Sequence, residues 1–210
     1  MPRVFISPLG FHEDFLLRSL VEFKAVNRDI VYTVTCSPLI GGVKRAFDSL
    51  IALSSKQGFP TPQLVELDCS NFYESIRRLR EILGKHLEDT VIFCAGGGLR
   101  FLTLVVLISL FFLRKPFTLH YEPETGVNEF TIKPEFFHNI FEDLDQAERK
   151  TLNIVIKNPG ANIREISKTL NIKEKTARNI VTRLKKRGLV VKKGRKEGVE
   201  PTEIADALFS

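Results

Sequence analysis

The chain has 210 residues, of which 43% are hydrophobic and 27% charged, with 13 glycines, 10 prolines and three cysteines. This composition is typical of a globular protein and excludes collagen-like, disordered and disulfide-rich classes. Residues 1–144 hold 15 Lys and Arg against 17 Asp and Glu, a net charge of −2, whereas residues 145–210 hold 16 against 8, a net charge of +8. We therefore expect two domains, 1–144 and 145–210, the second of which faces a polyanion.

The first domain alternates short apolar runs with amphipathic stretches of a dozen or more residues. The runs predict strands at 3–7, 29–35, 63–67 and 90–95, then a hairpin of 117–122 and 129–133. The amphipathic stretches predict helices at about 11–26, between Ser37-Pro38 and 56, after Ser70 as N-cap, and at 101–113. Parallel strands need crossovers of this length, so we expect an α/β fold: a Rossmann-like parallel sheet with a terminal hairpin.

The segment 101–113, FLTLVVLISLFFL, is apolar on every side. As a helix it would rise only about 20 Å, short of the roughly 30 Å of a bilayer's hydrocarbon core. We expect a core helix that packs on the sheet with one face and on a second subunit with the other, and no membrane contact.

Cysteine usage indicates a reducing compartment. Cys36, Cys69 and Cys94 each follow a strand-like run, and no two have the spacing of metal ligands. We expect small buried hydrophobic residues rather than disulfides, with no metal and no cofactor. The start of the chain leads directly into a strand pattern without the features of a signal peptide, so we expect a cytoplasmic protein.

Two loops at the carboxyl ends of predicted strands are unusual, and ligands of parallel sheets bind at these ends. The first, SPLGFHE at 7–13, contains His12 and Glu13, for which ligand contact or a helix start is favoured over acid–base catalysis. The second, AGGGLR at 95–100, has three glycines that allow backbone N–H groups to approach an anion. Arg100 would oppose the helix dipole, which a bound phosphate would explain, although a tight turn is the alternative.

The established nucleotide-binding and catalytic patterns are absent. The loop after the first strand offers only Gly10, so the GxGxxG fingerprint fails, and no GxxxxGK[ST] motif occurs. No Ser/His/Asp or Cys/His set can be assembled, and we therefore do not expect an enzyme.

The last third predicts a winged helix-turn-helix. Asp145 is the predicted N-cap of its first helix, 162–170 and 173–187 are the next two, and a strand, a basic wing and a short helix follow. Between Lys173 and Lys196 there are 11 basic residues and one acidic residue. This pattern favours a DNA duplex, with roughly 6–8 neutralised phosphates, over a solvated helix or a protein-binding domain. The predicted DNA contacts are Lys173, Lys175, Thr176, Arg178, Asn179, Thr182, Arg183, Lys186, Lys192, Lys193, Arg195 and Lys196.

Three segments together resemble a known family: RVFISPLGFHEDFLLRSL at 3–20, FCAGGGLRFLTLV at 93–105, and ISKTLNIKEKTARNIVTRLKKRGLV at 166–190. The chain resembles the CRISPR-associated transcription factors of archaeal type I-A loci, Csa-type regulators that join a CARF domain to a winged helix. The resemblance covers essentially the whole chain. It implies a homodimer that binds a cyclic oligoadenylate, cyclic tetra-adenylate, in a symmetric pocket and binds double-stranded promoter DNA through its winged helices.

By family position the ligand contacts fall on the two loops, with Ser37 and Pro38 as outer candidates. The full set, with Gly96 added from the glycine loop, is Ser7, Leu9, Gly10, Phe11, His12, Ser37, Pro38, Gly96, Gly97, Gly98, Leu99 and Arg100. The family commonly has Ser or Thr where this chain has Gly98, which weighs against ring cleavage. Three alternatives stay open: a ring nuclease, a nucleotide-sensing or redox-sensing Rossmann regulator, and a protein adaptor.

Overall fold

A computed structural model of the chain describes residues 2–123, 129–192 and 198–209. The chain separates into two compact units, Met1–Pro134 and Glu135–Ser210, which are described separately below. The second unit thus begins ten residues before the expected border at 144/145. The difference is a helix, 134–141, that the sequence analysis did not predict.

The first unit is built on a six-stranded sheet with the order β3-β2-β1-β4-β5-β6. The first five strands pair in parallel and β6 is antiparallel to β5, so the Rossmann-like sheet and its terminal hairpin are confirmed. The strands are β1 (Arg3–Pro8), β2 (Ile30–Ser37), β3 (Gln63–Asp68), β4 (Thr90–Cys94), β5 (Phe117–Tyr121) and β6 (Phe130–Ile132).

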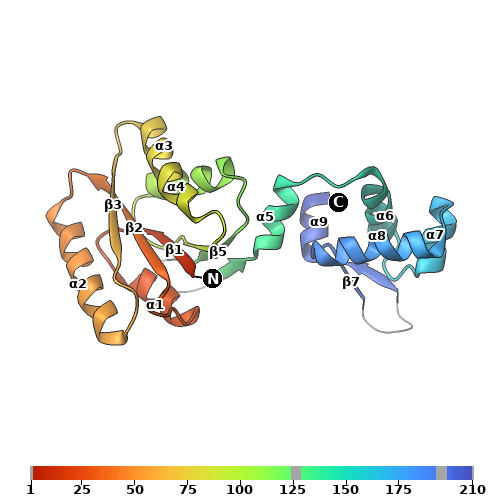
Figure 1. Cartoon of the computed structure of the whole chain (residues 1–210), viewed down its shortest axis with the longest axis horizontal. Coiled ribbons are helices and arrows are strands. Elements are labelled where there is room, and N and C mark those ends of the chain that lie inside the picture. The colour runs from red at the N-terminus through yellow and green to blue at the C-terminus, as the bar shows by residue number, and fades with distance from the viewer. Residues whose placement is uncertain (1, 124–128, 193–197, 210) are drawn as a thin grey trace. The chain divides into compact units, whose positions relative to one another are not determined.

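Helices cover both faces of this sheet: α1 and α2 lie on one side, α3 and α4 on the other (Figure 1). Their bounds are α1 (Asp14–Glu22), α2 (Gly41–Gln57), α3 (Phe72–Leu83), the 3-10 turn η1 (Gly84–His86) and α4 (Arg100–Phe112). The predicted helix 11–26 is shorter than expected at both ends. It ends early because Phe23 closes it and Lys24 adopts the left-handed region at φ 49°.

The N-cap of α3 is Asn71 and not Ser70. The Asn71 side chain accepts a hydrogen bond of 3.1 Å from the Glu74 N–H, whereas the Ser70 hydroxyl donates to Asp68.

The apolar helix α4 packs on the sheet and on α3. Leu102, Val105 and Leu110 are buried, while Phe101 meets Phe72 of α3 edge to face at 5.8 Å. An apolar strip stays exposed, with Phe112 at 62% and other members Leu99 and Leu104. No helix in the described part of the chain is long and apolar enough to cross a membrane.

The cysteine prediction was wrong for two of the three residues. Cys36, at the end of β2, and Cys69, just after β3, form a disulfide with a Cα–Cα distance of 5.4 Å. The parallel register explains it, because Ser37 pairs with Asp68 and so brings the two positions together. Cys94 is free and buried, and burial raises the pKa of its thiol to about 12.

The second unit is a winged helix-turn-helix with an extra helix at its start. Its elements are α5 (Pro134–Phe141), α6 (Gln146–Lys157), α7 (Ile163–Leu170), α8 (Glu174–Lys186), β7 (Val190–Lys192), β8 (Val199–Pro201) and α9 (Glu203–Phe209). Asp145 and Asn162 each form a capping box, with Glu148 and Glu165 respectively, so the two predicted helix starts are confirmed. Asn171 makes the turn in the left-handed conformation. The core is formed by Leu152, Val155, Ile166, Ala177, Ile180, Leu184, Leu189 and Val199.

Candidate ligand site and DNA-binding surface

Strands β1 and β4 lie side by side at the centre of the sheet, and their following helices cover opposite faces. Where the connections from two adjacent strands leave toward opposite faces of the sheet, a crevice remains beyond the carboxyl ends of those strands. Ligands of open α/β sheets bind in this crevice. The two loops singled out by the sequence follow these two strands. The topology therefore brings them to one place.

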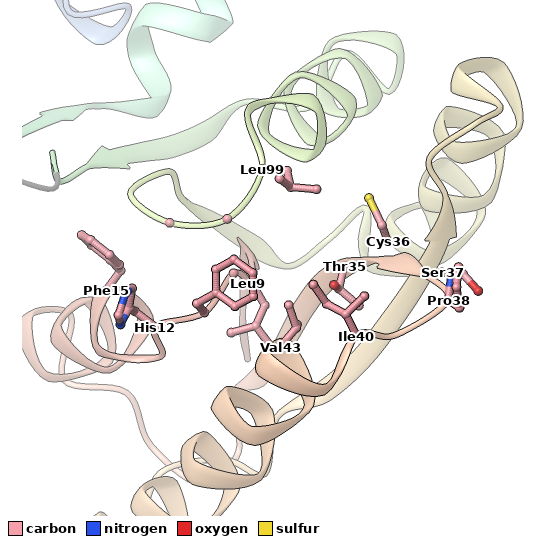
Figure 2. Close-up of a pocket in the computed structure, with 14 residues that line it drawn as sticks. Leu9, His12, Phe15, Thr35, Cys36, Ser37, Pro38, Ile40, Val43 and Leu99 are labelled. Carbon is pink, nitrogen blue, oxygen red and sulfur yellow. The ribbon is translucent and has the colours of Figure 1, made fainter.

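A pocket of about 510 Å³ occupies this place. His12 and Phe15 lie at one end and Ser37 and Pro38 at the other (Figure 2). Leu9 is on the floor between them. The full lining is Leu9, Gly10, Phe11, His12, Phe15, Thr35, Cys36, Ser37, Pro38, Ile40, Val43, Gly97, Gly98 and Leu99.

The two loops contact each other through glycines. A Cβ on Gly10 would lie 3.0 Å from the Cα of Gly98, and one on Gly98 would lie 2.7 Å from the Cβ of Pro8. Gly98 also has a φ of +75°, a backbone conformation that residues with a Cβ adopt only at a cost in conformational free energy. Glycine at 98 is therefore required by the backbone of the site itself.

Two helix N-termini open into this pocket. Ile40 before α2 and Leu99 before α4 are N-cap residues with extended backbones, and neither has a side chain that caps the helix. Both line the pocket. The first N–H groups of each helix have no intrahelical partner, so they offer donors to an anion.

Arg100 lies on the other side of the glycine loop. It lines a second hollow, of about 450 Å³, with Ala95, the three glycines, Thr103 and Tyr121. Its guanidinium is exposed and forms no ion pair within the described part of the chain. The glycine loop thus separates a mostly apolar pocket from a hollow that is lined by the positively charged side chain of Arg100.

Nine of the twelve predicted ligand residues line the larger pocket, and their contact with a ligand stays a prediction. Gly96 and Arg100 line the second hollow instead. Ser7 is buried beneath the loop, where its hydroxyl donates to the carbonyl oxygen of Pro8 at 3.2 Å. It supports the loop from below.

Sequence reasoning missed five pocket residues: Phe15, Thr35, Cys36, Ile40 and Val43. Thr35 and Cys36 stand directly before Ser37 at the carboxyl end of β2. They could have been predicted, because ligands of parallel sheets bind at the carboxyl ends of the strands. Phe15 and Val43 lie in the first turns of α1 and α2, and Ile40 is the N-cap residue of α2. Which face of a helix turns toward a pocket depends on tertiary packing.

The second site is the exposed surface of α8. Of the predicted DNA contacts, those in the described part of the chain all have exposed side chains. Arg183 is also held by two acidic residues at the start of α6, since its guanidinium pairs with the N-cap Asp145 at 2.8 Å and with Glu148 at 3.0 Å. Lys193, Arg195 and Lys196 of the predicted wing lie outside the described residues.

Helix α5 is tied to the carboxyl end of α8 by one arginine. The Arg187 guanidinium donates to the Asn139 side chain at 3.0 Å and to the backbone oxygens of Glu142 and Asp143. In return the Asn139 amide donates to the Arg187 carbonyl at 2.9 Å. The DNA-binding unit therefore includes α5 as a fixed part.

Comparisons with known proteins agree with this arrangement. Residues 3–133 match the family of the Csa3 CRISPR-associated Rossmann-like domain, and residues 144–191 match a winged helix-turn-helix DNA-binding domain. A Csa3 protein of Saccharolobus solfataricus, named as CRISPR locus-related, is 30% identical over 197 residues, which cover 93% of this chain and 83% of that protein.

The chain belongs to the Csa3 family. The resemblance drawn from the sequence is thereby confirmed, and so is the combination of a CARF-like Rossmann domain with a winged helix-turn-helix. Two solved structures are more distant from this chain. Can2 of Sulfobacillus thermosulfidooxidans with cyclic tetra-adenylate is 9% identical with a TM-score of 0.46, covering 97% of this chain and 62% of Can2. A MarR repressor of Listeria monocytogenes is 24% identical with a TM-score of 0.28, covering 30% of this chain and 45% of the repressor.

Proposed function

We propose that this Csa3-family chain is a transcriptional regulator of a CRISPR locus. It binds cyclic tetra-adenylate across a CARF homodimer and double-stranded promoter DNA through its winged helices. The observation that carries the proposal is the joining, in one chain, of a pocket at the switch point of the sheet with an exposed basic helix of a winged helix-turn-helix.

The pocket and the hollow beside it fit the two parts of a nucleotide. The larger pocket has apolar walls from Leu9, Phe15 and Val43, and its 510 Å³ lie in the range of small-molecule sites. An adenine base suits such walls. Phosphates suit the hollow, where Arg100, the first residue of α4, offers a positive charge beside the N–H donors of that helix start.

A ring with two-fold symmetry fits a pair of identical sites. The exposed apolar strip of α4 begins at Leu99, next to the glycine loop, and includes Leu104 and the last residue of the helix, Phe112. A second copy packed on this strip would bury it and bring two glycine loops together. Self-complementary contacts of this kind are the usual form of homodimers.

Ligand binding would reach the DNA through the order of elements along the chain. Strand β6 is hydrogen-bonded into the sheet up to Ile132, and α5 starts at Pro134, so one residue lies between them. Arg187 in turn fixes α5 to α8. The ligand shifts DNA affinity to the extent that it binds one arrangement of the dimer better than the other.

The site favours a regulator over an enzyme. A hydroxyl at position 98 could hold the 2′-OH of the ring for attack, but the positive φ of Gly98 and its contact with Pro8 exclude a side chain there without rearrangement. A ring nuclease would produce linear adenylates from the purified protein.

Calorimetric titration with cyclic tetra-adenylate tests the ligand half of the proposal. We expect one ring per two chains, with linear tetra-adenylate and NAD as controls. Arg100→Ala should weaken binding by about tenfold or more. Arg28→Ala should leave binding unchanged, because Arg28 is an exposed residue just before β2 and thus lies at the amino ends of the strands, opposite the pocket. No binding of the ring by the unmodified chain would contradict the proposal.

A further inference from the structure

A buried histidine and two glutamates meet at the hairpin edge of the CARF-like sheet, away from the pocket. His120 of β5 is 2% exposed, Glu22 is the last residue of α1, and Glu129 directly precedes β6. One ligand atom from each of the three lies within 4.8 Å of the others. These residues come from three segments that are far apart in the sequence.

The imidazole is oriented as a metal ligand. Its Nδ1 lies 3.1 Å from the hydroxyl oxygen of Thr131, the residue paired with His120 across the β5–β6 ladder. Its Nε2 faces the Glu22 carboxylate at 3.1 Å. A histidine that binds a metal through one nitrogen commonly donates its other N–H to a neighbouring oxygen, which fixes the ring. Phe23 holds the ring from the side, edge to face at 5.4 Å.

The charge of the cluster favours a cation. In the described part of the chain, neither Glu22 nor Glu129 forms an ion pair with a lysine or arginine. Two carboxylates at this separation repel each other. A bound divalent ion would reverse the repulsion and satisfy both.

We propose that Glu22, His120 and Glu129 form a binding site for a divalent transition metal, Zn²⁺. One imidazole nitrogen and two carboxylate oxygens are a donor set that Zn²⁺ accepts, and a water would complete the tetrahedron. Ligand atoms around Zn²⁺ are about 3.3 Å apart for bonds of about 2.0 Å. The present spacing needs a closure of about 1.5 Å at most, which the exposed glutamates allow.

The proposed metal site is connected to the glycine loop by a backbone hydrogen bond. The carbonyl oxygen of His120 accepts a hydrogen bond of 2.8 Å from the N–H of Ala95, the residue that precedes the three glycines. The ion would thus tie the end of α1 to the hairpin directly beside the glycine loop. This inference does not depend on the identity of the ligand in the pocket.

The test is titration of the full untagged chain with ZnCl2 after treatment with EDTA and removal of the chelator. We expect one Zn²⁺ per chain by calorimetry, a thermal midpoint raised by Zn²⁺, and no response to Mg²⁺. Glu129→Gln and Glu22→Gln, two exposed and isosteric changes, should each weaken Zn²⁺ binding by at least about tenfold.

The matched control is Glu142→Gln. Glu142, the residue after α5, faces the partly exposed His138 of α5 at 3.3 Å, an imidazole–carboxylate pair to which the described residues add no third metal ligand. This variant should bind Zn²⁺ as the unmodified chain does. Absence of Zn²⁺ binding by the unmodified chain, or binding that both Glu22→Gln and Glu129→Gln retain in full, would overturn the proposal. In that case His120 and Glu22 form only a hydrogen-bonded pair.

Discussion

Gly10 and Gly98 lie so close that a Cβ on the first would be 3.0 Å from the Cα of the second. This contact joins the loop after β1 to the loop after β4, and the pocket exists because the two backbones meet there. The two glycines are therefore part of the candidate binding site, because they allow this close backbone contact, even though they carry no functional group.

Gly98→Ala should destabilise the first unit by about 3 kcal/mol or more, because it adds a strained φ and a clash with Pro8. Gly58→Ala is the matched control, since Gly58 also has a positive φ but open space around its Cβ position. It should cost about 1 kcal/mol. The free energy of unfolding of both variants, measured by urea denaturation, separates the cost of the positive φ from the cost of the clash with Pro8. Equal losses in the two variants would show that the loop contact is unimportant.

Arg178→Ala should weaken binding to a labelled DNA duplex of random sequence by about tenfold. Arg178 is exposed on α8, so we expect it to neutralise a phosphate and its removal to reduce the salt slope by about 1. Fluorescence anisotropy between low and moderate KCl concentration measures both quantities. Lys157→Ala on α6 removes a charge elsewhere in the same unit and should change neither.

Asp29 makes the first unit sensitive to acid. Burial acts to raise the pKa of this carboxyl, but hydrogen bonds from Arg3 and from the Val26 N–H outweigh it and hold the pKa below the usual 3.8. Because the folded-state pKa is the lower one, the stabilisation is complete above the unfolded pKa and is lost as pH falls through the folded pKa.

Asp29→Asn should accordingly cost about 2 kcal/mol of unfolding free energy at pH 7. The difference from the unmodified chain should shrink as the pH falls below 3.8 toward the folded-state pKa. Chemical denaturation at several pH values measures it. A difference that does not change with pH would contradict the assignment to Asp29.

The Cys36–Cys69 disulfide should stabilise the first unit by about 3–4 kcal/mol, the entropy expected for a closed loop of 33 residues. Non-reducing peptide mapping should recover the linked pair, with Cys94 as a free thiol. Adding a dithiol reductant should lower the thermal midpoint of the unmodified chain. The Cys36→Ser variant should not respond to the reductant.

The parts of this protein that follow from local pattern could be predicted from the sequence. Apolar runs gave the six strands, and the glycine loop pointed to the carboxyl end of β4. The parts that depend on register could not be predicted. Nothing local shows that Cys36 and Cys69 meet, because their proximity arises from the pairing of β2 with β3.

Helix α5 had a signal that was overlooked. Pro134 stands at its first position, and Phe137 and Phe141, four residues apart, are buried. These are a helix start and a helical face. The charge split at 144/145 favoured a later border because α5 itself carries few charges.

The hydrogen bonds between Asn139 and Arg187 have a practical consequence for work on the isolated DNA-binding unit. A fragment that begins at residue 145 loses Asn139 and leaves the half-buried Arg187 guanidinium at the base of α8 without most of its acceptors. A fragment that begins at residue 134 keeps them. In the shorter fragment the carboxyl end of α8 would unwind more easily. DNA affinities measured with that fragment would therefore be lower than those of the intact chain.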